Sequence, residues 1–133
     1  MIVDHSSKAL FKQLIVIIPN LRKIKESGKS KSGGFMDLNL DILQSSKDIK
    51  RIALSHYYKH DCGDMIADPD MEFMVNLEDE WVEPLTFQDY RVYQEVYSEG
   101  MDRADMRLRA SLHEFAKMWF MNLKYQGHLI SRY

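Results

Sequence analysis

Hydrophobic positions near the N-terminus recur at helical spacing. Asp4, Ser6 and Ser7 are suitable N-caps for this helix. The apolar side chains that follow at intervals of three or four residues are Leu10, Phe11, Leu14, Ile15, Ile17 and Ile18. Pro19 ends the helix because it has no backbone N–H to donate. Since proline is accepted in the first turn of a helix, we expect a second, short helix over residues 19–26.

The C-terminal part of the chain carries the longest helical pattern. Asp102 is expected to cap this helix, with Asp105 in its first turn and Gly127 at its end. Its continuous apolar stripe consists of Ala104, Leu108, Leu112, Phe115, Trp119 and Leu123. A stripe of this length predicts a helix that covers one face of a sheet.

Between these helices the apolar and polar residues alternate with the period of a β-strand. The alternating stretches are residues 35–43, 49–59, 71–77, 81–87 and 90–97. Residues 27–34 are rich in Gly and Ser and are expected to form a solvated loop, and Pro84 places its strand near an edge. The short links favour antiparallel pairing.

These elements predict a single α+β domain over residues 1–133. Its curved antiparallel sheet of about five strands is expected to be covered on one face by the N-terminal helices and the long C-terminal helix. A chain of 133 residues with 45% hydrophobic and 29% charged residues is long and apolar enough for one core.

Several features of composition favour a cytoplasmic protein. A single cysteine rules out an internal disulfide and fits a reducing compartment. The longest apolar run, residues 14–18, is too short to span a membrane. The first residues lack the basic start and cleavage site of a signal peptide.

The net charge of -2 conceals a strong asymmetry along the chain. Residues 1–59 carry 11 Lys/Arg and 5 Asp/Glu, a net of +6. Residues 60–105 carry 2 and 14, a net of -12, and residues 106–133 carry 5 and 1, a net of +4. One interpretation is that the basic ends fold against the acidic middle. The other is that residues 60–105 form an acidic surface that attracts a basic partner.

The central stretch, residues 56–73, gathers the side chains best suited to chemistry. The candidate ligand-binding residues are His56, Tyr58, His60, Asp64, Asp68 and Asp70. His56 is the only candidate for acid–base catalysis. On a strand, His56 and His60 would lie about 13 Å apart, and the acids do not follow the EF-hand order. We therefore predict no bound metal and no cofactor. Turn formation by Asp, Gly and Pro is the alternative interpretation of this stretch.

Two further chemistries are disfavoured by the charges around their residues. Cys62 lies between acids, which suppress the thiolate that a nucleophile requires. A stacking face for nucleic acid is conceivable on Tyr57, Tyr90, Tyr93 and Tyr97. Because residues 60–105 contain only two arginines to hold phosphates, we expect no nucleic-acid binding.

Nearly the whole chain resembles an uncharacterised bacterial family known only as a domain of unknown function. The resemblance rests on residues 35–41 (FMDLNLD), 53–60 (ALSHYYKH), 63–71 (GDMIADPDM) and 85–89 (LTFQD), and on Trp119, Asn122, Leu123, Gln126 and Gly127. The chain is also similar to YqiB-like proteins of enterobacteria and to small domains on phage and plasmid elements. The resemblance implies no established activity and no catalytic residues.

Three functional hypotheses follow from the sequence. The leading one is a non-enzymatic cytoplasmic binding or accessory protein that uses the acidic surface of residues 60–105 to bind a protein. If charge determines recognition, that partner protein is basic. The alternative is a small enzyme or divalent-metal-binding protein that uses the turn between His56 and Asp70. The third is a homodimer that associates through Trp81, Phe87 or an edge strand. We expect no membrane association.

Overall fold

A computed structural model of the chain describes residues 1–98 and 100–131. Within these residues the α-helices are α1 (His5–Ile17) and α2 (Met106–Tyr125), and a 3-10 helix, η1, spans Leu21–Lys23. The strands are β1 (Ser27–Ser30), β2 (Leu38–Ser45), β3 (Ile49–Lys59), β4 (Met65–Asn76), β5 (Trp81–Gln88), β6 (Tyr93–Glu95), β7 (Tyr97–Ser98) and β8 (Arg103–Ala104).

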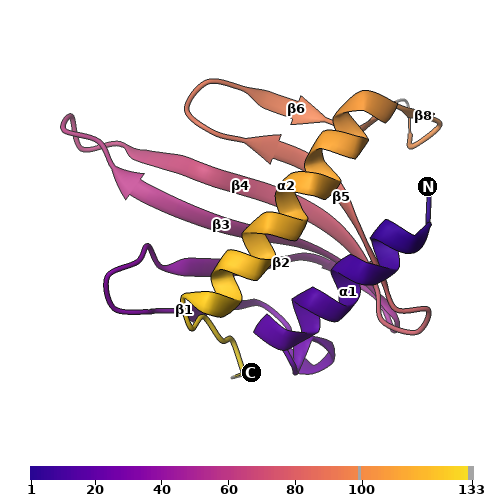
Figure 1. Ribbon diagram of the computed structural model, residues 1–133, viewed down its shortest axis with the longest axis horizontal. Helices are drawn as coiled ribbons and strands as arrows, with labels where there is room; N and C mark the ends of the chain where they lie inside the picture. Colours follow the sequence, from indigo (N-terminus) through magenta and orange to yellow (C-terminus); the bar gives the residue numbers. More distant parts are fainter. Residues whose placement is uncertain (99, 132–133) are drawn as a thin grey trace.

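The first six strands form one antiparallel sheet in chain order, and β7 pairs with β8 in a separate ribbon. Figure 1 shows α1 and α2 lying on one face of the six-stranded sheet. The predicted α+β class, with helices from both ends of the chain on one face, is confirmed. In the described part of the chain the main sheet has six strands rather than about five, and it is open rather than curved.

Helix α1 begins and ends where the sequence predicted. Asp4 is the N-cap, and its carboxylate accepts a hydrogen bond from the backbone N–H of Ser7 at 3.2 Å. The helix ends at Ile17, two residues before Pro19. Its buried apolar side chains are Leu10, Phe11, Leu14 and Ile17. The second helix is shorter than expected, because only η1 is helical between residues 19 and 26.

Helix α2 is capped by Asp105 rather than by Asp102, which corrects the sequence prediction. The Asp105 carboxylate accepts a hydrogen bond from the backbone N–H of Leu108 at 3.1 Å. Gly127, with φ of +86°, ends the helical segment as expected. The side chains of α2 pack on the sheet, and the rings of Phe120 and Phe73 lie 5.4 Å apart. No helix among the described residues is long and apolar enough to cross a membrane.

Part of the expected loop at residues 27–34 is instead the edge strand β1. It pairs antiparallel with β2, and Gly28 lies opposite Leu40. Gly28 is required here because a Cβ atom would lie 2.7 Å from Cγ2 of Ile130, which packs over the strand. Ser, Gly and Lys have low strand propensity, so the sequence alone did not indicate a strand. Pairing with β2 and packing by the C-terminal segment supply what local propensity lacks.

The long connection expected between β3 and β4 is a tight hairpin turn. Lys59 pairs with Met65, and Gly63, with φ of +97°, allows the turn. Strand β4 starts at Met65, six residues before the predicted start at residue 71. The polar and proline residues at positions 68–70 interrupt the hydrophobic alternation, which is why the pattern concealed the first half of the strand.

Strand β5 confirms the predicted strand at residues 81–87. Pro84 lies at a position in β5 where a missing backbone N–H removes few hydrogen bonds between strands. On the side of β5 away from β4, β6 pairs only with residues 86–88. The N–H that Pro84 lacks is therefore not needed by β6. The expected strand at residues 90–97 is broken into β6 and β7, which belong to different sheets.

Candidate functional site

The face of the sheet opposite the helices carries two rows of cross-strand neighbours. The first row is Lys29, Asn39, Ser55, Asp70, Gln88 and Tyr93. The second row is Ser27, Asp41, Ala53, Glu72, Thr86 and Glu95. Between them runs the row of Leu40, Leu54, Met71 and Phe87, which faces the helices, and the ring of Phe87 contacts that of Phe115. We call the two polar rows the uncovered face.

The middle of the uncovered face is hollowed because β3 carries small side chains there. Ala53 and Ser55 are buried by the longer side chains on each side. Strands β2 and β4, which flank β3, lie about 10 Å apart. A cavity of about 390 Å³ lies over β1, β2 and β3, and its lining residues are Ser27, Gly28, Lys29, Asn39, Leu40, Asp41, Ser55 and Tyr57. We give the name β3 trough to the polar surface around β3. Asn39, Asp41 and Ser55 line the cavity, and Ala53, Asp70 and Glu72 continue the surface toward β4.

Tyr57 closes one end of the β3 trough by a hydrogen bond to Asp70. Its hydroxyl donates to Oδ2 of Asp70 over 2.6 Å. Burial, the hydrogen bond to Asp70 and the nearby acids raise the pKa of Tyr57 to about 12, so the hydroxyl stays protonated and remains a donor. The carboxylate of Asp70 is thus fixed toward the trough.

Burial and neighbouring acids both act on the pKa of Asp70. Burial raises this pKa most, the hydrogen bond from Tyr57 lowers it, and the charges of Glu72 and Asp41 raise it further. Glu72 is compensated, because Arg51 Nη2 lies 2.7 Å from its Oε1. Asp41 and Asp70 take part in none of the ion pairs found among the described residues. Both carboxylates would attract a cation that approaches the uncovered face, whereas Lys29 in the first row would repel it.

The structure places His56 away from the uncovered face, under the helices. His56 is buried, and its Nδ1 lies 2.8 Å from the backbone oxygen of Asp37. The rings of Trp119 and His128 lie 5.5 Å and 6.0 Å from its ring. These contacts place His56 in the core beside α2 rather than in a pocket that a substrate could enter.

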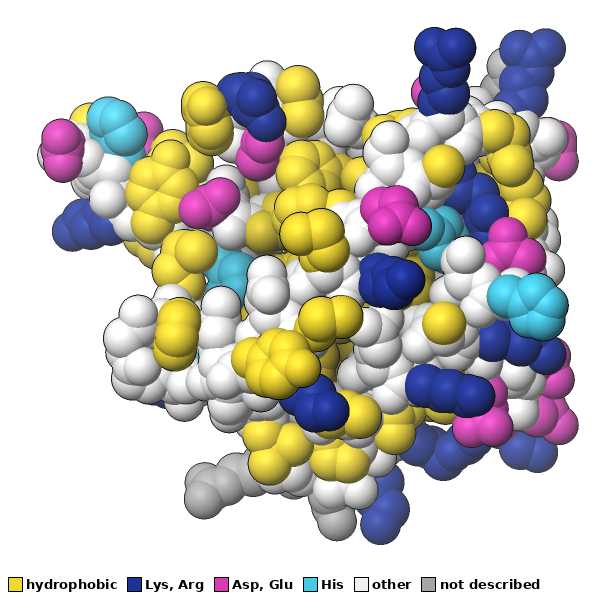
Figure 2. Space-filling view, in the orientation of Figure 1, with side chains coloured by type: hydrophobic (Ala, Val, Ile, Leu, Met, Phe, Trp, Pro, Cys, Tyr) yellow, Lys and Arg dark blue, Asp and Glu magenta, His cyan; other side chains and the backbone are white. Residues whose placement is uncertain are grey.

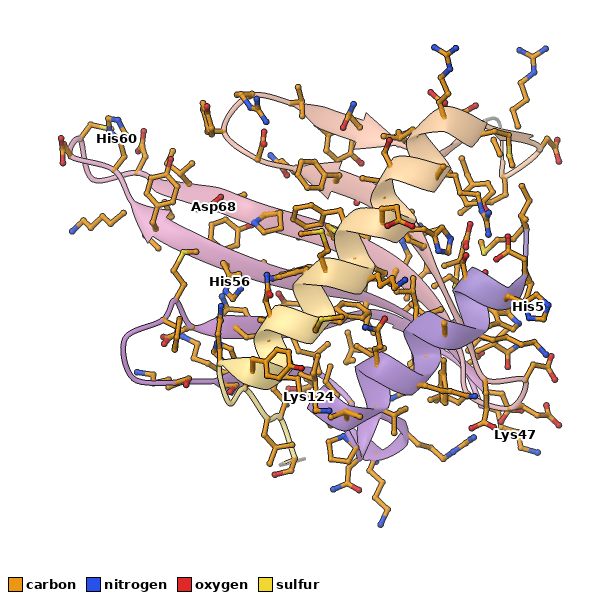
Figure 3. All side chains as sticks on the ribbon, in the orientation of Figure 1. His5, Lys47, His56, His60, Asp68 and Lys124 are labelled. Carbon is orange, nitrogen blue, oxygen red and sulfur yellow. The ribbon has the colours of Figure 1, made fainter. Side chains whose placement is uncertain are left out.

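The remaining predicted site residues are spread along the β3–β4 hairpin. Figure 3 shows His60 at the tip of the hairpin, far from His56 and Asp68. In the turn, His60 Nδ1 lies 3.1 Å from Sγ of Cys62, and Cys62 Sγ lies 3.5 Å from Oδ2 of Asp64. Tyr58 and Asp68 are exposed on the two strands of the hairpin. Among the described residues, no group of three or more His, Cys, Asp or Glu side chains is arranged to hold a metal ion.

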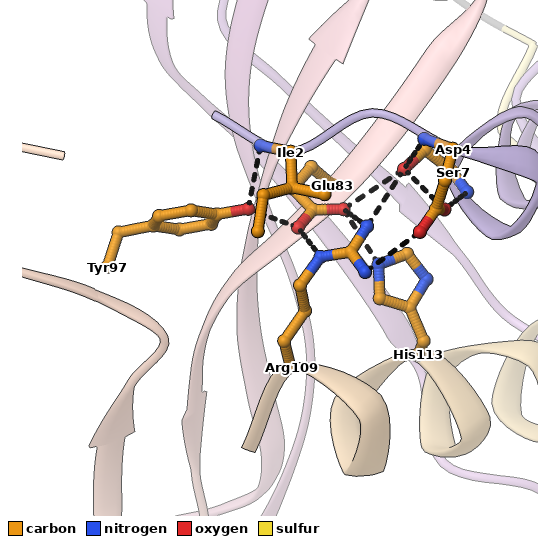
Figure 4. Close-up of polar contacts among 7 residues, drawn as sticks. All are labelled: Ile2, Asp4, Ser7, Glu83, Tyr97, Arg109 and His113. Carbon is orange, nitrogen blue, oxygen red and sulfur yellow. Dashed lines mark hydrogen bonds and ion pairs between the residues drawn. The ribbon is translucent and has the colours of Figure 1, made fainter. Parts of the chain in front are cut away.

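A second polar cluster, which the sequence interpretation missed, lies buried between β5 and the helices. Glu83 is fully buried, and Arg109 of α2 donates to both of its carboxylate oxygens, at 2.6 and 3.1 Å. His113, one turn further along α2, donates from Nε2 to Glu83 at 2.7 Å. Tyr97 also donates to Glu83, and Arg109 reaches Asp4 at 3.0 Å (Figure 4).

The donors around Glu83 keep it ionised despite its burial. Burial acts to raise the pKa of Glu83, but hydrogen bonds from His113, Arg109 and Tyr97 outweigh it and hold the pKa below its ordinary value. The hydrogen bond from Arg109 lowers the pKa of Asp4 to about 2. Since the cluster joins the start of α1, strand β5 and helix α2, its role is to fix the helices on the sheet. The sequence signal was the pair of basic residues at positions 109 and 113, on the buried side of the helix.

An antiparallel sheet with helices packed on one face and ordered polar rows on the other defines an α+β domain with one exposed sheet surface. The chain belongs to the family described as Domain of unknown function (DUF6908), which it matches over residues 9–129. Comparison with curated proteins and with solved structures finds no match for this chain. The family description assigns no activity.

Proposed function

We propose that the protein is a non-enzymatic cytoplasmic binding or accessory protein, and that its uncovered face binds a cationic group of a partner protein. Of the acidic surface of residues 60–105, the acids on that face are Asp70, Glu95 and Glu72, and Glu72 is already paired with Arg51. The proposed site also includes Asp41 of β2. Glu83 is excluded because it is buried and already paired with Arg109. The observation that carries the proposal is the hydrogen bond from Tyr57 to Asp70, which orients a carboxylate on the face that also carries Asp41.

The β3 trough matches the needs of a guanidinium or ammonium group. Asp41 and Asp70 supply charge from opposite sides, and the oxygens of Asn39 and Ser55 can accept hydrogen bonds between them. A hydrogen bond to a charged group contributes about 1.5–3 kcal/mol. The carboxylates of Asp41 and Asp70 would therefore favour binding of an exposed Arg or Lys side chain. The same charges would repel phosphates, and we propose that this face binds no nucleic acid.

The second hypothesis, an enzyme or metal-binding protein acting through the His56–Asp70 turn, has less support. His56 is buried against a backbone oxygen, and only Asp70 of the predicted set reaches the trough. The contacts of His60, Cys62 and Asp64 with one another fit the ordering of a hairpin turn.

The binding proposal can be tested by titrating the full chain with a tetra-arginine peptide and following backbone amide signals by NMR. We expect saturable shifts at Asn39, Ser55 and Asp70, and about tenfold weaker binding for Asp70→Asn. Glu78→Gln makes the same change of charge at the exposed β4–β5 turn and should bind as the wild type does. Shifts confined to other surfaces, or equal affinities for all three proteins, would reject the proposal.

A further inference from the structure

A groove runs between α1 and α2 on the side of the helices that faces away from the sheet. One part of it is a cavity of about 290 Å³, lined by Val16 of α1 and by Met121 and Tyr125 of α2. A second cavity, of about 250 Å³, lies between the same two helices. Gln13 lines both cavities, and its side-chain amide donates to the backbone oxygen of Lys117 at 3.1 Å. The two cavities are therefore parts of one feature, which we call the α1–α2 groove.

The first of these cavities is bordered by large apolar side chains that are open to solvent. Val16 is 49% exposed, Met121 43% and Tyr125 79%, and Met118 of α2 is also exposed. Figure 2 shows hydrophobic side chains on this face of the molecule, with Lys and Arg side chains beside them. Apolar surface of this kind, with flexible methionines, is typical of an interaction site.

The charged side chains that line the α1–α2 groove are mostly basic. Lys12 of α1 lines it, and so do Lys117 and Lys124 of α2. Glu114 is the one acid in its lining, and His5 lies at the start of α1. Counting Lys and Glu, three positive charges and one negative charge give a net of +2. The three lysines and Glu114 take part in none of the ion pairs found among the described residues.

The acids on the other side of α1 do not neutralise this charge. Lys12 also lines a cavity there, together with Lys8 of α1 and with Asp79 and Glu80 of the β4–β5 turn. Two lysines thus balance two acids in that cavity. The two lysines of α2 do not line it. The positive charge on the α2 side of the groove is therefore open to a ligand that approaches from solvent.

We propose that the α1–α2 groove binds an acidic amphipathic helix of a partner protein. The hydrophobic side chains of that helix lie between Val16 and Met121, and its carboxylates lie beside Lys117 and Lys124. The groove between two helices accepts the ridge of side chains of a third helix, and this mode of recognition recurs among proteins that bind helical segments. Charge selects an acidic helix, because only carboxylates on its flanks neutralise the lysines.

The same properties disfavour two other occupants. A second copy of this chain would bring a second groove with a net charge of +2, and the two would repel each other. A lipid surface offers negative charge but is flat, whereas the groove is concave and suits inserted side chains. Binding in the groove is also independent of the β3 trough, since the helices and the uncovered face lie on opposite sides of the sheet.

Fluorescence anisotropy of a labelled peptide, titrated with the full chain at low salt, tests the proposal. The probe is a helical peptide of about 15 residues, with leucine on one face and glutamate on the other. We expect saturable binding, and at least about fivefold weaker binding of a matched peptide with glutamine in place of glutamate. No binding of the acidic peptide, or equal affinities for the two peptides, would overturn the proposal.

Variants of the chain locate the binding site. Lys117→Glu and Met121→Glu should each weaken binding of the acidic peptide at least about fivefold. Lys59→Glu and Met65→Glu make the same two changes at exposed positions of the β3–β4 hairpin and should bind as the wild type does. All four positions are on the surface, so circular dichroism should show folded proteins. Equal effects of the groove and hairpin variants would contradict binding in the groove.

Vesicles of phosphatidylserine distinguish a partner helix from a lipid surface. We expect the chain to remain in solution when such vesicles are sedimented. Sedimentation of the wild-type chain with the vesicles, abolished by Lys117→Glu, would assign the groove to anionic lipid and overturn the proposed helix.

Discussion

The hydroxyl of Tyr57 on β3 donates a hydrogen bond of 2.6 Å to Oδ2 of Asp70 on the neighbouring strand β4. The bond lies on the face of the sheet that the helices leave uncovered. The bond holds one carboxylate beside Tyr57, which together with Asp41 lines a cavity on that face. Two opposing effects act on Asp70, because burial and neighbouring acids raise its pKa while Tyr57 lowers it. A nearby cation would therefore stabilise the ionised form of Asp70.

Removing the hydroxyl should make Asp70 a weaker acid. We expect Tyr57→Phe to raise the pKa of Asp70 further, because the variant loses the hydrogen bond that stabilises the ionised form. The ¹³C signal of the Asp70 carboxyl, followed from pH 2 to pH 8, measures the change. Tyr93→Phe is the control, since Tyr93 lies on the same face and is not bonded to Asp70. An Asp70 pKa that is unchanged or lower in Tyr57→Phe would contradict the assigned contact.

Replacing Glu83 should be among the most destabilising changes of a polar residue in this chain. Glu83→Gln removes the charge that compensates Arg109 in a buried site, and we expect a loss of about 3–5 kcal/mol in the free energy of unfolding. Urea unfolding measures this loss. Glu78→Gln at the exposed turn should change stability by no more than about 0.5 kcal/mol. A Glu83→Gln protein as stable as the wild type would show that the buried cluster does not hold the helices in place.

The same cluster should make the fold sensitive to acid. The folded-state pKa of Asp4, about 2, lies below its ordinary value of 3.8, so its contribution is complete above that value. The contribution is lost as pH falls from about 4 toward 2. Glu83 acts in the same direction because its pKa is also lowered. Stability measured in urea should therefore fall steeply below pH 4.

Asp4→Asn separates the charge of Asp4 from its role as a cap. Asparagine is an equally good N-cap, but it cannot titrate or pair with Arg109 as an ion. We expect this variant to be less stable than the wild type at pH 6 and to approach it at pH 2. Parallel curves of stability against pH for the two proteins would contradict a role for the Asp4 charge.

His56 should matter for stability rather than for catalysis or metal binding. His56→Ala removes a ring packed against Trp119 and leaves the Asp37 carbonyl without its partner, for an expected loss of about 1–3 kcal/mol. Divalent zinc, magnesium or calcium should leave the melting temperature of the wild-type chain unchanged. A rise in melting temperature that His60→Ala abolishes would instead support a metal site in the hairpin.

Sequence patterns correctly predicted the elements that depend on residues close together in the chain. The cap at Asp4, the stop before Pro19, strand β3 and the glycine after α2 were all predicted correctly. Strand β1 was missed, because its Gly and Ser residues are ordered by β2 and Ile130 rather than by their own propensity. The start of β4 was hidden by the polar residues at positions 68–70.

The candidate site was only partly predictable for a related reason. Asp70 was identified from the acidic central stretch, but its neighbours Asp41 and Tyr57 come from other strands, and only the register places them together. Glu83, Arg109 and His113 lie up to 30 positions apart in the chain, so no spacing rule connected them. Sequence patterns suggest which residue types matter, whereas the sheet register decides which of them meet.

Cation binding in the β3 trough is best tested by calorimetry of the full chain with tetra-arginine peptide between pH 4 and pH 7 at constant low salt. Because burial raises the pKa of Asp70, the wild-type affinity should rise about tenfold over this range as the carboxyl ionises. Asp70→Asn should bind more weakly and with a flatter dependence on pH. Equal affinities and equal pH profiles for the two proteins would contradict binding at the uncovered face.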